Sequence, residues 1–93
     1  MVENLIKTRI RSNAVTITTT ATQIPANPLP TRKSVAIRNN GAATVYLGHS
    51  GVTTSNGYPL DAGKEFPIDI GEDVDVYGIV TTGTVEVRIL EGT

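Results

Sequence analysis

Six short segments of this chain alternate apolar and polar residues, and this period of two constrains the fold more than any other feature. In "VEVRIL", Val85, Val87 and Ile89 occupy one phase, while Glu86 and Arg88 occupy the other. Successive side chains of a strand point to opposite faces of a sheet, so such a segment predicts a half-buried strand. No segment shows the 3.6-residue apolar period of an amphipathic helix. The other five alternating segments lie at residues 13–20, 33–39, 43–49, 65–70 and 73–80.

The composition also favours strands. Thr, Val and Ile supply 33 of the 93 residues, tryptophan is absent and phenylalanine occurs once. β-Branched side chains lose freedom in helices and pack well on pleated surfaces. We therefore predict an all-β fold, a small antiparallel sandwich or jelly-roll-like barrel of six to eight short strands. The residues expected in its core are Val15, Ile17, Val35, Ile37, Val45, Leu47, Phe66, Ile68, Ile70, Val74, Val76, Val85, Val87 and Ile89.

The short length and the absence of cysteine limit the stability of a single copy. A chain of 93 residues makes one domain with a small core. Without cysteine, neither a disulfide nor a thiolate metal site can supplement that core. Small domains without such supports often gain stability by oligomerisation. We expect residues 13–93 to form a single β-sandwich domain, preceded by an extended N-terminal arm at residues 1–12.

Neither a membrane segment nor a secretory leader is expected. The chain contains no run of 18 apolar residues, which is the length that a spanning helix requires. Its first nine residues lack an apolar stretch followed by a small-residue cleavage site.

Two stretches between alternating segments contain residues typical of turns or loops. Asn39, Asn40 and Gly41 tolerate the positive φ that tight turns need, so we predict a hairpin between the segments at 33–39 and 43–49. The prolines at positions 25, 28 and 30 lack an amide donor. They predict an edge or a crossing loop there rather than a central strand.

Charge is distributed unevenly along the chain. Residues 1–38 carry six Lys or Arg against one Glu, whereas residues 39–93 carry two against eight Asp or Glu, for a net charge of −1. This asymmetry favours pairing inside the molecule, and it also suits head-to-tail packing of copies or contact with an acidic partner. The basic and aromatic residues are too few to predict nucleic-acid binding.

His49 and Ser50 are the pair that would suggest nucleophilic catalysis. A catalytic serine and its imidazole base must lie within about 2.6–3.2 Å, with the base oriented by a third group. Adjacent residues of an extended chain point to opposite faces, and the glycines at 48 and 51 do not have the Gly-x-Ser-x-Gly spacing of a nucleophile elbow. We interpret the pair as the turn that ends a strand, and we expect no catalytic residues.

The acidic run "DIGEDVD" at residues 69–75 is the candidate for a cation site. Asp73 and Asp75 would share one face of a strand, but the ligand spacing of a calcium loop is absent. We interpret this run as a solvated turn whose charges protect a strand edge. No metal and no cofactor are expected.

The order of the turn motifs along the chain carries a family resemblance. "VAIRNNGAATVYLGHSGVTTSNGYPLDAGKEFPIDI" is followed by "VYGIVTTGTVEVRILEG". Over about residues 33–92 this order resembles that of small virion proteins of tailed bacteriophages. The resemblance implies a β-sandwich or barrel module that serves as a head decoration protein or as a module on tails and fibres. It also implies a structural role without enzymatic activity, in a protein made in the host cytoplasm and carried on the virion.

We accordingly expect a capsid decoration or stabilisation protein. It would bind the outer shell as a homotrimer and clamp neighbouring subunits of the major capsid protein. The arm and the proline-containing segment are the expected contacts, because the arm mixes apolar and basic residues and could bind acidic groups of the shell. The residues expected at this contact are Leu5, Ile6, Lys7, Arg9, Ile10, Arg11, Pro25, Pro28 and Pro30.

A tail or fibre module that binds carbohydrate or a host receptor is the alternative function. Tyrosine side chains can stack on sugar rings, although such residues more often cover the end of a sandwich. The ligand contacts would then be His49, Tyr58 and Tyr77, around the loop at residues 50–58.

Overall fold

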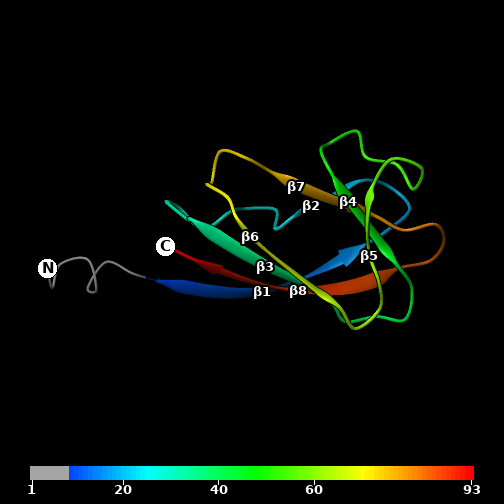
Figure 1. Cartoon of the computed structure of the whole chain (residues 1–93), viewed down its shortest axis with the longest axis horizontal. Helices are drawn as coiled ribbons and strands as arrows, with labels where there is room; N and C mark the ends of the chain where they lie inside the picture. The colour runs from blue at the N-terminus through cyan, green and yellow to red at the C-terminus, as the bar shows by residue number, and fades with distance from the viewer. Residues whose placement is uncertain (1–8) are drawn as a thin grey trace, which may run out of the picture.

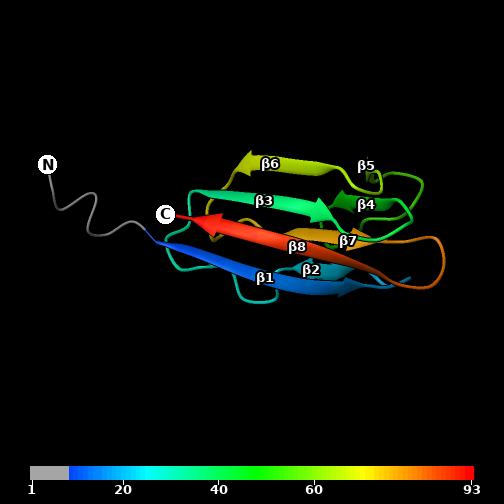
Figure 2. The same ribbon diagram turned by 90° about the horizontal axis from the view of Figure 1, so that it is seen from below.

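The computed structural model describes residues 9–93, which form eight strands in two facing sheets (Figures 1 and 2). One sheet has the order β1-β8-β3-β6 and the other has the order β2-β7-β4-β5. Within this range no helix is present that could cross a membrane. The predicted all-β sandwich is confirmed. The strands are β1 (Ile10–Ile17), β2 (Thr22–Ile24), β3 (Ser34–Asn39), β4 (Val45–Gly48), β5 (Tyr58–Leu60), β6 (Glu65–Asp69), β7 (Val76–Ile79) and β8 (Val85–Gly92).

The topology follows from four antiparallel pairs: β1 with β8, β2 with β7, β3 with β6 and β4 with β5. Each pair joins one of the first four strands to one of the last four, which is the pairing of one long antiparallel hairpin folded over on itself. The β3–β8 and β4–β7 pairs then complete the two sheets. This is the jelly-roll arrangement, in which every connection except β4–β5 crosses from one sheet to the other.

The hairpin predicted at Asn39, Asn40 and Gly41 is wrong. β3 pairs with β8 on one side and with β6 on the other, so neither of its edges is free for β4. The three residues instead carry the chain across to the second sheet. The buried Asn39 side chain holds this corner, because its Oδ1 accepts the Gly41 N–H at 2.9 Å and its Nδ2 donates to the carbonyls of Ala43 and Leu60.

The core between the sheets contains most of the side chains that alternation predicts. Val15, Phe66, Ile68 and Ile70 are only partly buried at its margin. Alternation does not find Ile24 and Leu60, because β2 and β5 span three residues each and are too short to show a period. The buried cluster comprises Ile17, Ile24, Val35, Ile37, Val45, Leu47, Leu60, Val76, Val80, Val85, Val87 and Ile89.

Val74 is the predicted core residue that lies in solvent, with 55% of its surface exposed. It has the same phase as Val76, but β7 begins only at Val76. Val74 belongs to the preceding turn, where its N–H donates to the Gly71 carbonyl at 3.4 Å. The period of two therefore continues in the sequence beyond the end of the strand.

The N-terminal boundary of the sheet lies earlier than predicted. β1 begins at Ile10, and Ile10 and Ser12 lie opposite Gly92 and Leu90 of β8. Residues 10–12 are therefore part of the sandwich, and the prediction that they belong to the arm is wrong. The arm up to residue 8 lies outside the described residues.

Candidate partner-binding surface

One end of the sandwich, which we call the arm end, is built around the buried carboxylate of Glu91. The arm end consists of the start of β1, the proline segment (residues 25–30) and the β6–β7 turn (residues 70–75) (Figure 1). Glu91 continues the inward phase of Val85, Val87 and Ile89 along β8, and none of its surface is exposed.

Three donors hold the Glu91 carboxylate. Arg32 Nη1 donates to Oε2 at 2.9 Å, and Arg11 Nη2 donates to Oε1 at 2.9 Å. The Leu29 N–H adds a bond to Oε2, also at 2.9 Å. A buried charge is tolerated only when its oxygens are paired and hydrogen-bonded, and this carboxylate meets that condition.

Arg32 extends the same network to the β6–β7 turn. Its side chain is fully buried, and its Nε and Nη2 donate to the carbonyls of Gly71 and Val74 at 3.2 and 2.7 Å. A second bond joins the segments nearby, since Glu72 Oε1 accepts the Thr31 N–H at 2.8 Å. The proline segment, the turn and β8 are therefore tied together by side chains rather than by a sheet.

The bonds to Glu91 determine its ionisation. Burial by itself raises the pKa of Glu91, but the hydrogen bonds from the Leu29 N–H, from Arg32 and from Arg11 outweigh burial and hold the pKa below its ordinary value of 4.5. A carboxyl group whose pKa is depressed by folding stabilises the fold above its unfolded pKa, and that contribution is lost as pH falls through the folded pKa.

We therefore expect the free energy of unfolding to fall as the pH is lowered below about 4.5. The Glu91→Gln variant lacks this carboxyl. Its free energy of unfolding should therefore be lower at neutral pH and should fall less steeply as the pH is lowered. Urea denaturation at a series of pH values measures both profiles. Parallel profiles for the two proteins would show that Glu91 does not link stability to pH.

The arm end brings together basic and proline residues that the sequence analysis selected separately. Arg9 Nη2 donates to the Pro30 carbonyl at 3.0 Å, and Arg11 Nη2 donates to the Asn27 carbonyl. The start of β1 and the proline segment are therefore in direct contact. Arg11 is half-buried, and its Nη2 donates to both Glu91 and Asn27. The Arg9 residue is exposed.

The nine predicted shell contacts differ in accessibility. Ile10 is 77% exposed, Pro30 is exposed, Pro28 is half-buried and Pro25 is buried. Pro25 therefore supports the segment from beneath and offers little surface to a partner. The remaining predicted contacts, Leu5, Ile6 and Lys7, lie outside the described residues.

An apolar patch lies on the outer face of the β1-β8-β3-β6 sheet next to the arm end. We call Ile10, Ala36, Pro67 and Leu90 the outer-face patch. Leu90 is 49% exposed and lies opposite Ala36, which in turn lies opposite Pro67. These residues and Ile10 line a shallow depression. A patch of this kind on a small domain is a candidate for contact with another molecule.

Sequence reasoning did not select Glu91 or Arg32, which organise the arm end. For Glu91 a signal exists, because a carboxylate in the inward phase of an alternating strand requires a buried partner. For Arg32 no signal exists, because it lies in an irregular segment between β2 and β3.

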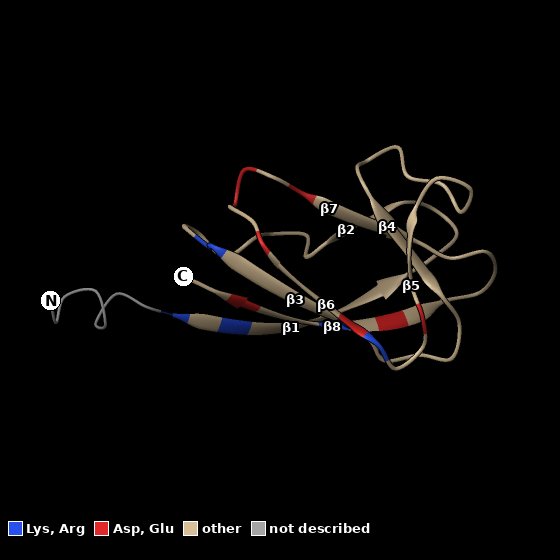
Figure 3. Ribbon diagram, in the orientation of Figure 1, with Lys and Arg blue, Asp and Glu red and all other residues tan. Residues whose placement is uncertain are grey.

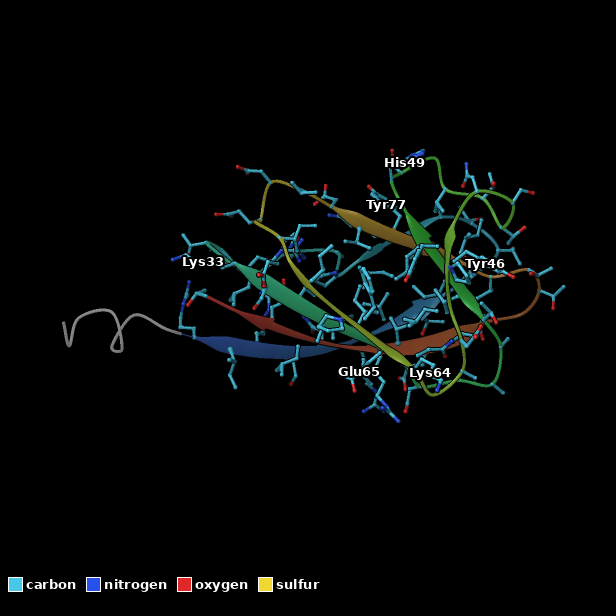
Figure 4. The ribbon with its side chains drawn as sticks, in the orientation of Figure 1. Lys33, Tyr46, His49, Lys64, Glu65 and Tyr77 are labelled. Carbon is cyan, nitrogen blue, oxygen red and sulfur yellow. The ribbon has the colours of Figure 1, made fainter. Side chains whose placement is uncertain are left out.

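The alternative ligand residues are divided between two surfaces. Tyr77 lies in the outward phase of β7 opposite Gly48, near His49 at the end of β4 (Figure 4). Tyr58 instead packs against Phe66 of the other sheet, with ring centroids 5.3 Å apart. The structure thus brings His49 and Tyr77 together and places Tyr58 elsewhere.

A residue that was not selected, Tyr46, lies beside Tyr77. Tyr46 occupies the outward phase of β4, opposite Ile79 of β7 and Pro59 of β5. Tyr46 and Tyr77 are therefore diagonal neighbours on the outer face of the β2-β7-β4-β5 sheet (Figure 4). The sequence predicts an outward-facing Tyr46, because this residue alternates with the inward Val45 and Leu47.

His49 and Ser50 form a turn. The Gly51 N–H donates to His49 Nδ1 at 2.8 Å, and the Val52 N–H donates to the His49 carbonyl at 2.9 Å. In a catalytic triad Nδ1 carries the proton and donates to a carboxylate, whereas here Nδ1 accepts. Within residues 9–93, no group of three or more His, Asp or Glu side chains is placed to hold a metal ion.

The charge asymmetry is resolved in part inside the molecule. Arg11 and Arg32 from the first half of the chain both pair with Glu91 from the second half. Figure 3 shows basic and acidic residues gathered near the arm end, where the acidic β6–β7 turn lies, and Figure 4 labels Lys33 at the same end.

Comparison with protein-family models finds no match, and comparison with curated proteins finds no relative.

Proposed function

We propose that this chain is a non-enzymatic structural protein of a bacteriophage virion, a decoration protein that binds the outer shell through its arm end. The observation that carries the proposal is the contact between the start of β1 and the proline segment. The sequence offered these two segments as separate shell contacts, and their contact makes them one continuous surface. The major capsid protein would be the partner, and the bound form would be a homotrimer on the capsid surface.

The mechanism of stabilisation is mass action. A ligand that binds the assembled shell and not its dissociated subunits stabilises the shell by RT ln(1 + [L]/Kd), about 2.7 kcal/mol at 100 times Kd. The Glu91 network supports this role because it fixes the proline segment before binding. A segment that is already ordered loses less conformational entropy when it meets its partner.

Removing residues 2–8 should abolish binding to the shell without unfolding the domain, because β1 begins at Ile10. We expect the binding constant for empty capsids, measured by co-sedimentation, to fall at least about tenfold, equivalent to ~1.4 kcal/mol. The matched control is Tyr77→Ala, which alters the surface on the other sheet. Undiminished sedimentation of the shortened chain would rule out the arm as a shell contact.

A carbohydrate- or receptor-binding module is the second candidate function. The outer face of β4 and β7 favours it, because Tyr46 and Tyr77 are diagonal neighbours there and both side chains are partly exposed. Tyrosine rings that keep part of their surface in solvent can stack on sugar rings.

On a glycan array, Tyr77→Ala should reduce binding about tenfold, the loss expected of one aromatic contact worth ~1–1.5 kcal/mol. Tyr58→Ala is the control, because Tyr58 packs against Phe66 on a different surface. Equal losses in the two variants would contradict a ligand site at Tyr77. Absence of binding by the unmodified protein would remove the second candidate.

A further inference from the structure

Three of the four edge strands in the described chain are unsuited to pairing, and one is open. β1 and β6 flank one sheet, and β2 and β5 flank the other. β5 and β6 each carry a proline at their centre, Pro59 and Pro67, and β2 spans three residues directly before Pro25. β1 spans eight residues and contains no proline. Exposed edges without such protection are templates for an added strand.

The hydrogen-bonding phase of β1 leaves alternate residues free to pair. The Thr93 N–H donates to the Arg9 carbonyl, and the Asn40 N–H donates to the Glu86 carbonyl. In an antiparallel ladder such bonds alternate, so the odd-numbered residues of β1 face β8 and the even-numbered ones face outward. The outward N–H and C=O groups belong to Ile10, Ser12, Ala14 and Thr16, none of which carries a charge.

Partly apolar surface lies on both sides of the open edge. On the inner side a groove runs between β1 and the proline segment. Its apolar lining includes Val15, Pro25 and Ala26, and its polar lining is Arg11, Asn13 and Asn27. On the outer side lies the outer-face patch, with Leu90 opposite the small Ser12. A strand added at this edge would therefore bury side chains of both its phases.

We propose that the open edge of β1 binds residues 1–8 of a second copy of this chain as an added strand. In extended form, residues 1–8 are long enough to pair along the whole of the eight-residue β1. Leu5 and Ile6 are adjacent, so a strand presents them to opposite faces. One would enter the groove and the other would lie toward the outer-face patch.

The same segment is poorly placed to pair with its own β1. Arg9 is fixed in the line of β1, because its carbonyl accepts from Thr93 and its Nη2 donates to Pro30. Folding back would require a tight turn within Lys7, Thr8 and Arg9, which contain no glycine, asparagine, aspartate or proline. Tight hairpin turns need positive φ, which a β-branched residue such as Thr8 disfavours. The occupant therefore comes from a second copy.

This contact is heterologous, because the N-terminal segment of one copy meets the edge strand of the next. Heterologous contacts form a ring when the rotation between copies closes. A ring of three copies gives the homotrimer, and this step alone rests on the proposed function. The strand pairing itself needs no shell and can be tested in the isolated protein.

Amide hydrogen exchange of the full chain and of a chain lacking residues 2–8 tests the pairing. In the full chain the outward amides of Ser12, Ala14 and Thr16 should exchange at least about tenfold more slowly than in the shortened chain. The internal controls are Asn13 and Val15, whose amides face β8 and should be protected equally in both. Light scattering should give three times the 9.8 kDa chain mass for the full chain and the monomer mass for the shortened one.

Equal exchange of the outward amides in both chains would overturn the proposal. Protection in a full chain of monomer mass would overturn it as well, because the segment would then occupy its own edge.

The Ala14→Pro variant tests the strand pairing without removing the arm, because it removes an outward N–H and spares the bonds to β8. We expect this variant to be monomeric. If shells still bind this monomeric variant, shell binding does not depend on the strand pairing. If pairing fails in the full chain but shells bind, only the strand proposal is lost.

Discussion

Arg32→Met should destabilise the protein by about 3–5 kcal/mol in urea unfolding, a large effect for a single substitution. Glu91 would remain fully buried and would keep only Arg11 and the Leu29 N–H as partners. The carbonyls of Gly71 and Val74 would also lose their donors. Breaking a buried ion pair by removing one member costs far more than the pair contributes, because a buried charge is left without compensation.

Two further variants separate this explanation from a general effect of losing a cation. Arg88→Met removes the exposed pair with Glu86 and should cost no more than about 1 kcal/mol. The double variant Arg32→Met/Glu91→Leu removes both buried charges and should recover part of the stability lost in the single variant. A single Arg32→Met variant as stable as Arg88→Met would contradict the role assigned to the network.

The fold was predictable because its long strands carry a clear period of two. β3 and β8 are central strands with one face on the core, and alternation identified Val35, Ile37, Val85, Val87 and Ile89 correctly. Alternation reports which face of a strand is buried, and it carries no information on which strands are neighbours. The turn at Asn39 therefore predicted a hairpin, while the competition of β6 and β8 for the edges of β3 decided otherwise.

From the sequence, only the exposed residues of the candidate surface could be predicted, and not the buried residues beneath them. Arg9, Ile10 and Pro30 could be selected from the sequence because exposed basic, apolar and proline residues indicate contact surfaces. The groups that hold them together come from distant parts of the chain, since Arg32 and Glu91 are 59 residues apart. No local pattern predicts such a pairing, although the inward phase of Glu91 indicates that some cation must reach it.

Asn39→Leu should cost on the order of 3 kcal/mol, because the side chain it replaces satisfies three backbone groups at the corner between the sheets. Leucine has the same number of side-chain heavy atoms and the same branching but no polar atoms, so it would leave the Gly41 N–H and the carbonyls of Ala43 and Leu60 without this partner. Buried polar groups that lose a partner carry the full cost of their desolvation. Asn40→Leu is the matched control, because Asn40 is exposed, and its stability should change by less than about 0.5 kcal/mol.

Asn39→Asp tests the direction of these bonds. An ionised aspartate only accepts, so its carboxylate would face the carbonyl oxygens of Ala43 and Leu60 with no proton between them. Protonation restores one donor, and the folded state would therefore raise the pKa of this aspartate. The free energy of unfolding of the variant relative to the unmodified protein should then increase as the pH is lowered from 7 toward 4. A difference that does not change with pH would mean that the Asn39 amide is not the donor to these carbonyls. The corner between β3 and β4 would then be held by the packing of Gly41 against Val85.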